Sequence, residues 1–239
     1  MLGQSIRFNS WVLGLFALIT AALLAFTHLS TKDRIAEAKR EVEKRALLEI
    51  VPLERHNNDL LVDTLEIPAA YWPTLGIDGG NINIARDGNK LVAIIVPAVA
   101  PDGYSGDIQM IIGINVDGTV AGVRVISHSE TPGLGDKVDL NKDDWILSFN
   151  GKSLTNPKPD GWKVKKDKGD FDQFTGATIT PRAVVQQVFK SLQYYKEDKA
   201  RLLKAATEAQ SVIEQPSKTT DQATGKTADK ITAEATDNG

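Results

Sequence analysis

The 239-residue sequence contains no cysteine, only three histidines and 6% aromatic residues. The absence of cysteine excludes disulfides, iron–sulfur ligation, thiolate zinc sites and cysteine nucleophiles. The histidines, His28, His56 and His128, are too far apart in the sequence to indicate a metal site. Redox chemistry in this chain would therefore depend on an organic cofactor.

Strong charge of either sign is also lacking. The chain has 28 Lys and Arg and 31 Asp and Glu residues, which gives a net charge of −3. No stretch has the basic density of a nucleic-acid-binding face, so we expect no nucleic-acid partner. With 41% hydrophobic residues, the chain can form one globular domain with accessory segments.

A long apolar run lies near the N-terminus. Residues 11–29 carry no formal charge and are rich in Leu, Ala and Phe, and a helix needs about 20 such residues to span a bilayer. The nearest candidate cleavage site, 25–27, lies inside the run, which favours an uncleaved membrane anchor over residues 1–30 instead of a signal peptide. A buried soluble helix is disfavoured because the run is apolar on every face.

The flanking charges leave the orientation of this anchor open. Arg7 precedes the run, whereas Lys32 and Arg34 follow it, and this count alone would keep the following domain in the cytoplasm. Acidic residues are mixed into the second flank, however, and a large domain can be translocated despite its charge.

The next segment, residues 31–52, predicts a juxtamembrane helix with Ser30 or Thr31 as its cap and Pro52 at its end. It would serve either as a stalk that packs on a partner or as a solvated charged helix. Charge and periodicity support both interpretations equally.

Two β-hairpins follow the stalk. Asp-Gly pairs separate the apolar segments 82–86 and 90–98, and likewise 108–116 and 119–127. Asp-Gly between alternating apolar segments is a strong hairpin signal. We therefore predict an α+β domain over residues 53–213, with a mostly antiparallel sheet and packed helices.

Other segments frame this sheet. The loops Pro101–Gly106 and Glu130–Gly135 have the Pro and Gly content of ordered turns, which need no function. Residues 141–149 predict a short helix capped by Asn141, and its Trp145 is of a type more often found in a core. The polar tail 214–239 has no aromatic residue and is predicted to be disordered.

The stretch 169–188 changes abruptly from small and hydroxyl residues to a helical apolar pattern. Thr180 fits a helix N-cap, and Pro181 fits the first turn. Thr175 and Thr178 precede this helix, whose N-terminus favours a phosphate group. Three interpretations remain open: a structural turn, a nucleophilic threonine that lacks an obvious base, and a turn that holds phosphate without a nucleotide P-loop motif.

A family resemblance adds to these patterns. Asp172–Thr178, DQFTGAT, resembles the flavinylation motif Asp-x-x-(Ser/Thr)-Gly-Ala-(Ser/Thr). Together with the loops 101–106 and 130–135, it resembles the G-type subunit of the Rnf/Rsx ion-translocating electron transport complex. The C-type subunit of the sodium-translocating NADH:quinone reductase shares the threonine motif and the second loop, whereas the first loop is more similar to the G-type subunit.

This resemblance implies a phosphoester between FMN and Thr178, attached by a dedicated flavin transferase that recognises Asp172. It also implies a single-pass inner membrane protein with a cytoplasmic N-terminus, a periplasmic flavin domain and the other complex subunits as partners. The protein would be an electron carrier and not a self-contained catalyst. Beyond Thr178 and Asp172, the expected flavin-binding residues are Tyr104, Glu130, Thr131, Gly133, Leu134, Trp145, Thr175, Gly176 and Ala177.

One alternative from another class is kept. The chain could be a flavin-free extracytoplasmic binding or scaffold subunit of a membrane complex, in which the threonine turn is purely structural.

Overall fold

A computed structural model describes residues 2–213, so the prediction for the tail 214–239 lies outside the described residues. The chain divides into two compact units, Met1–Glu197 and Asp198–Gly239. The first contains the sheet, both glycine loops and the threonine motif. In the second, Arg201 forms an ion pair with Asp198 one helical turn earlier.

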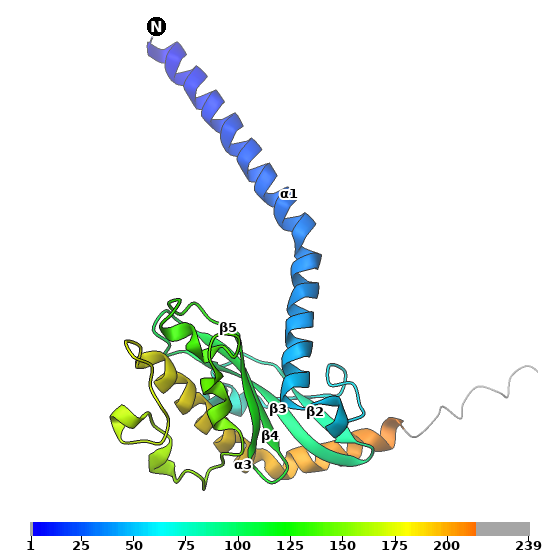
Figure 1. Cartoon of the computed structure of the whole chain (residues 1–239). Coiled ribbons are helices and arrows are strands. Elements are labelled where there is room, and N and C mark those ends of the chain that lie inside the picture. Colours follow the sequence, from blue (N-terminus) through cyan, green and yellow to red (C-terminus); the bar gives the residue numbers. More distant parts are fainter. Residues whose placement is uncertain (1, 214–239) are drawn as a thin grey trace, which may run out of the picture. The chain divides into compact units, whose positions relative to one another are not determined.

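The centre of the first unit is a five-stranded sheet in the order β1-β2-β3-β4-β5 (Figure 1). Every neighbouring pair is antiparallel, and both predicted hairpins are present as β2–β3 and β4–β5. The predicted α+β class is therefore confirmed. The strands are β1 (Thr64–Glu66), β2 (Asn81–Asp87), β3 (Lys90–Ala100), β4 (Ile108–Asn115) and β5 (Val120–Ser127).

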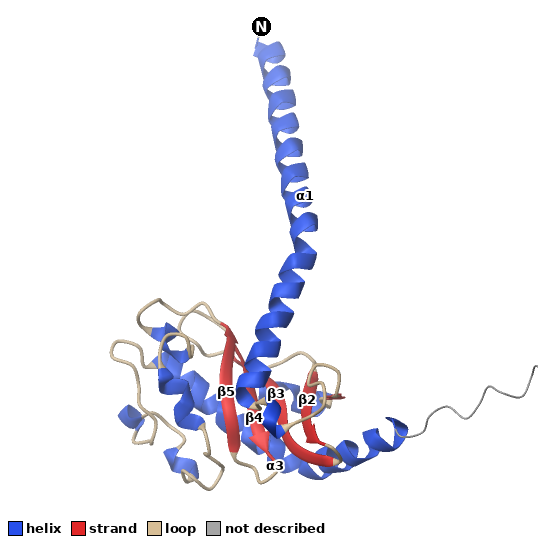
Figure 2. Ribbon diagram, turned by 45° about the vertical axis from the view of Figure 1, so that its right-hand side comes forward, coloured by secondary structure: helices blue, strands red, loops and turns tan. Residues whose placement is uncertain are grey.

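Helices cover both faces of this sheet (Figures 1 and 2). Strand residues alternate between the faces, so Ile95 and Ile111 pack with the end of α1 (Leu2–Ile50), whereas their neighbours Ile94 and Ile112 are buried on the other side. The first turns of α3 (Ile179–Ile213) lie across that other side. The remaining helical elements are α2 (Trp72–Leu75) and the 3₁₀ turns Leu53–Arg55, Ala69–Tyr71, Gly135–Val138, Asp144–Phe149, Pro159–Gly161 and Lys165–Asp167.

Helix α1 joins the predicted anchor to the predicted stalk without a break. The cap expected at Ser30 or Thr31 is wrong, because the Thr31 hydroxyl donates a hydrogen bond of 2.8 Å to the Thr27 carbonyl one turn earlier. The helix ends at Ile50, just ahead of Pro52, as expected. Its apolar part is fully exposed and is the one helix among residues 2–213 long and apolar enough to span a membrane.

The end of α1 fits into a hollow made by two glycines. Gly113 on β4 lies directly opposite Gly122 on β5, and both contact Ile50. A Cβ atom at Gly113 would overlap the Ile50 Cγ2 atom, so only glycine leaves room for this side chain. Glu49 adds an ion pair of 2.7 Å with Arg124 of β5. The membrane-proximal helix is thus fixed directly to the sheet.

The predicted helix 141–149 differs in its start and its type. It is a 3₁₀ helix, Asp144–Phe149, and its cap is Asp143, whose carboxylate accepts the Trp145 N–H at 2.9 Å. Asn141 instead donates its side-chain amide to Asp139 at 2.9 Å. Because Asp and Asn cap helices about equally well, the sequence alone could not choose between neighbouring candidates.

Candidate functional site

The three segments that carried the resemblance meet at one buried carboxylate. Glu130 is 4% exposed, and its Oε1 accepts the backbone N–H of Ser105 at 3.0 Å, while its Oε2 accepts the hydroxyl of Thr180. Ser105 belongs to the loop 101–106, and Thr180 to the first turn of α3. Glu130 therefore joins both glycine loops to the helix that follows the threonine motif.

The glycines of these loops make this close approach feasible. A Cβ atom at Gly135 would lie 2.7 Å from Glu130 Oε2 and 2.8 Å from the Thr180 hydroxyl oxygen. A Cβ atom at Gly103 would lie 2.8 Å from Glu130 Oε1. Side chains at either glycine would push the loops away from the carboxylate.

The role expected for Thr180 as the N-cap is wrong. Helix α3 begins at Ile179, so Thr180 already lies inside its first turn, and Thr178 immediately precedes the helix. The Thr180 side chain is fully buried and is used by Glu130. The partner that fixes this hydroxyl lies fifty residues earlier in the chain, which no local capping pattern reveals.

The threonine motif itself forms a tight turn. Phe174 and Ala177 form a short antiparallel bridge, and the Ala177 N–H donates to the Phe174 carbonyl at 3.1 Å. Gly176 occupies the third position with φ +83°, a backbone conformation that favours glycine. A Cβ atom there would lie 3.3 Å from the Leu134 side chain, so the second glycine loop lies beside this turn.

Thr178 is the accessible hydroxyl at the helix start. It is half-buried, and among residues 2–213 its side chain has no hydrogen-bond partner. Its carbonyl accepts the Arg182 N–H at 3.3 Å, which places its backbone on the first turn of α3. Thr175 is exposed on the turn, whereas Thr180 is buried. Thr178 thus combines an open hydroxyl with the positive end of a helix.

An aromatic cluster supports the turn from below. The Trp145 indole N–H donates to the Asp172 carbonyl at 2.8 Å, and its ring packs edge-on against Phe174, with centroids 5.0 Å apart. Trp145 is buried, and its packing against Phe149 extends the cluster into the core. Its predicted contact with a flavin remains a prediction.

The other expected flavin-binding residues lie in the two glycine loops. Tyr104 is 68% exposed, and Leu134 is 41% exposed. The Thr131 carbonyl accepts the Leu134 and Gly135 N–H groups at 3.1 Å, and the Gly133 N–H donates to Asp136 at 2.7 Å. These bonds hold the second loop in one shape, with Leu134 turned towards Gly176.

A second feature near the motif was not expected from the sequence. The Arg182 guanidinium binds both carboxylate oxygens of Asp167 at 2.7 and 3.0 Å. This hydrogen bond is the main cause that lowers the pKa of Asp167 and raises the pKa of Arg182. Asp172 lies nearby with an exposed ion pair of 2.6 Å to Lys165. The segment that holds Asp167 and Lys165 is thereby tied to both ends of the motif.

Two family models match the chain. Residues 1–50 match the RnfG N-terminal region, and residues 103–193 match the FMN-binding domain. The second match begins at Gly103 of the first glycine loop and includes Glu130, the threonine motif and the first turns of α3.

Relatives share similarity over most of the chain. The G-type subunit of the ion-translocating oxidoreductase complex of Pseudomonas aeruginosa is 47% identical over 201 residues, which cover 84% of this chain and 93% of that protein. The protein of the same name from Vibrio atlanticus is 46% identical, with 84% and 95% covered. That from Shewanella amazonensis is 46% identical, with 82% and 91% covered.

Proposed function

The chain belongs to the family of G-type subunits of ion-translocating oxidoreductase complexes, and on this premise we propose that it is a membrane-anchored electron carrier with FMN joined to Thr178. The observation that carries the proposal is the half-buried Thr178 hydroxyl, which has no hydrogen-bond partner within residues 2–213 and immediately precedes a long helix in an FMN-binding domain.

The residues around Thr178 fit a flavin phosphate. A phosphodiester retains one negative charge, and the first N–H groups of α3, with the positive end of its dipole, stabilise such an anion. Gly176 and Ala177 carry little side chain, so the ribityl phosphate can approach the backbone. Thr180 is withdrawn from this chemistry by its bond to Glu130.

The linkage requires a group transfer that this chain accepts. The Thr178 oxygen forms a bond to the flavin phosphorus, a leaving group departs from that phosphorus, and the hydroxyl proton passes to a base. No carboxylate or histidine is hydrogen-bonded to the Thr178 side chain in residues 2–213, so the base belongs to a separate flavin transferase. The exposed Asp172 is available for recognition by that enzyme.

FMN supplies the chemistry of electron transfer, because its ring accepts and releases electrons. The chain supplies position. Glu130 fixes both glycine loops against the helix start, and the Trp145 cluster supports the turn. A covalent bond also prevents loss of the cofactor outside the cytoplasm.

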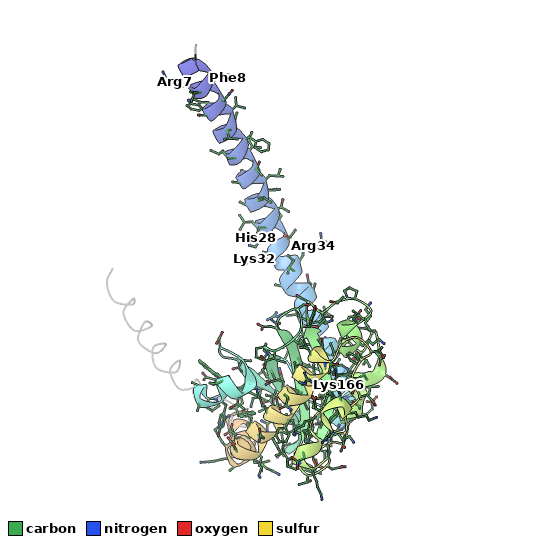
Figure 3. The ribbon with its side chains drawn as sticks, turned by 90° about the vertical axis from the view of Figure 1, so that its left-hand side faces the viewer. Arg7, Phe8, His28, Lys32, Arg34 and Lys166 are labelled. Carbon is green, nitrogen blue, oxygen red and sulfur yellow. The ribbon has the colours of Figure 1, made fainter. Side chains whose placement is uncertain are left out.

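The exposed apolar part of α1 supports attachment to the inner membrane. Arg7 lies before this part, and Lys32 and Arg34 lie just after it (Figure 3). We propose that the N-terminus is cytoplasmic, that the sheet domain is periplasmic and that the other complex subunits are the partners.

A denaturing gel tests this function. Protein produced together with its flavin transferase is expected to give a band that fluoresces under ultraviolet light, and Thr178→Ala is expected to abolish it. Thr175→Ala is the matched control, because it removes an exposed hydroxyl of the same turn and should leave the fluorescence in place. A wild-type band without flavin would instead favour the scaffold function.

A further inference from the structure

We propose that residues 163–168, here called the lysine loop, form a docking surface for the acidic face of a partner electron carrier in the same complex. The inference rests on the proposed function, since a carrier must exchange electrons with a second protein. Lys166 marks the loop in Figure 3.

Charge distinguishes this loop from the rest of the chain. Its four lysines and Asp167 sum to +3, whereas the whole chain carries −3. All four lysines are exposed. Lys165 pairs with Asp172, and Arg182 binds Asp167, but no carboxylate of residues 2–213 forms a salt bridge with the other three lysines. Three cationic groups therefore remain available to an external anionic surface.

The backbone of the lysine loop is held firmly. The Lys165 N–H donates to the Phe171 carbonyl at 2.7 Å, and the Phe171 N–H donates to the Lys163 carbonyl at 3.2 Å. Gly169 packs so closely on Lys163 that a Cβ atom would overlap its carbonyl. Val164 is fully buried and fixes the loop to the core. A fixed array of charges loses little conformational entropy when a partner binds.

The loop also lies beside the proposed flavin attachment point. The Lys166 N–H donates to the Gln173 side chain within the threonine motif at 3.1 Å. Asp167 binds Arg182, whose own N–H donates to the Thr178 carbonyl at 3.3 Å. A protein seated on the lysines would therefore lie next to Thr178. Clustered charge of one sign selects a partner of opposite sign and accelerates its approach.

Zero-length cross-linking tests the contact directly. A carbodiimide joins a lysine amine to a carboxylate only when the two touch. In the purified complex, we expect Lys163, Lys166 or Lys168 to be joined to acidic residues of a neighbouring protein of the complex, as mapped by mass spectrometry. Cross-links from these lysines only to carboxylates of this chain would overturn the proposal.

Charge reversal tests the consequence. Lys163→Glu with Lys166→Glu should slow electron transfer through the flavin about tenfold at low ionic strength, and about 1 M salt should remove the difference because it shortens the Debye length to about 3 Å. The matched control is Lys90→Glu with Lys196→Glu. Lys90 lies at the far end of β3 from the loop 101–106, and Lys196 is about 27 Å along α3 from Thr178.

The outcomes separate this proposal from the proposed function. Gel fluorescence of the wild type reports whether flavin is attached at all. An equal rate in both double variants, with flavin present, would contradict docking on the lysine loop. Loss of flavin only in the Lys163 and Lys166 variant would assign the loop to maturation and would also overturn the proposal.

Discussion

At the scale of single residues, Glu130 organises the site. Its carboxylate accepts a backbone N–H from one loop and a hydroxyl from α3, although it was expected only as part of a flavin pocket wall. The motifs could be read from the sequence because each is a local pattern. The Glu130–Thr180 bond could not, since it depends on how two distant segments fold together.

Glu130→Gln should therefore destabilise the protein. The variant keeps the side-chain shape but loses the charge, and a hydrogen bond to a charged group contributes about 1.5–3 kcal/mol. Denaturant unfolding of the full chain in detergent measures this loss, with the exposed Glu54→Gln as the control. Equal unfolding free energies for the two variants would refute the role of Glu130.

Tyr195 predicts a response to alkaline pH. Burial, followed by the nearby Asp117 carboxylate, raises the pKa of Tyr195 above its ordinary value, and its hydroxyl donates to the Val116 carbonyl at 2.9 Å. The folded state favours the protonated phenol, so its stabilisation is complete below about pH 10 and is lost as the pH rises through the raised pKa. Tyr195→Phe should flatten this decline in unfolding free energy; parallel pH curves for the two proteins would contradict it.

At the scale of elements, the hairpins were predictable and the attachment of α1 was not. Asp-Gly turns mark β2–β3 and β4–β5 in the sequence. The hollow for Ile50 depends instead on strand register, which sets Gly113 opposite Gly122. A glycine within a strand can mark a close backbone approach, but it does not identify what approaches.

Gly113→Ala should cost about 1–3 kcal/mol through overpacking against Ile50. A double-mutant cycle with Ile50→Ala checks the cause, because truncation of Ile50 makes room for the new methyl group. We expect the double variant to be more stable than the sum of the two single effects predicts. Strict additivity in thermal unfolding would show that the two residues do not compete for this space.

At the scale of the whole molecule, one continuous helix links the apolar segment to the sheet. The sequence predicted both parts of this helix from composition and periodicity. It could not predict their continuity, because Ser30 and Thr31 resemble a cap but Thr31 bonds back into the helix. The side of the membrane on which the sheet lies also cannot be derived from the flanking charges.

Reporter fusions should place that sheet in the periplasm. A phosphatase that is active only outside the cytoplasm should be active when fused after Lys44, which lies beyond the apolar segment. A reporter that requires the cytoplasm should be inactive at the same position. The reverse pattern would overturn the proposed orientation while leaving the flavin proposal untouched.

The central claim concerns the Thr178 oxygen, and peptide mass spectrometry tests it most directly. Digestion of protein produced with its flavin transferase should give a peptide containing residues 172–182 whose mass is increased by one flavin phosphate group, with fragment ions that assign the group to Thr178. Thr178→Ser, which retains a hydroxyl, should still be modified, and Thr178→Ala should not. An unmodified peptide, or flavin located on Thr175 or Thr180, would contradict the account.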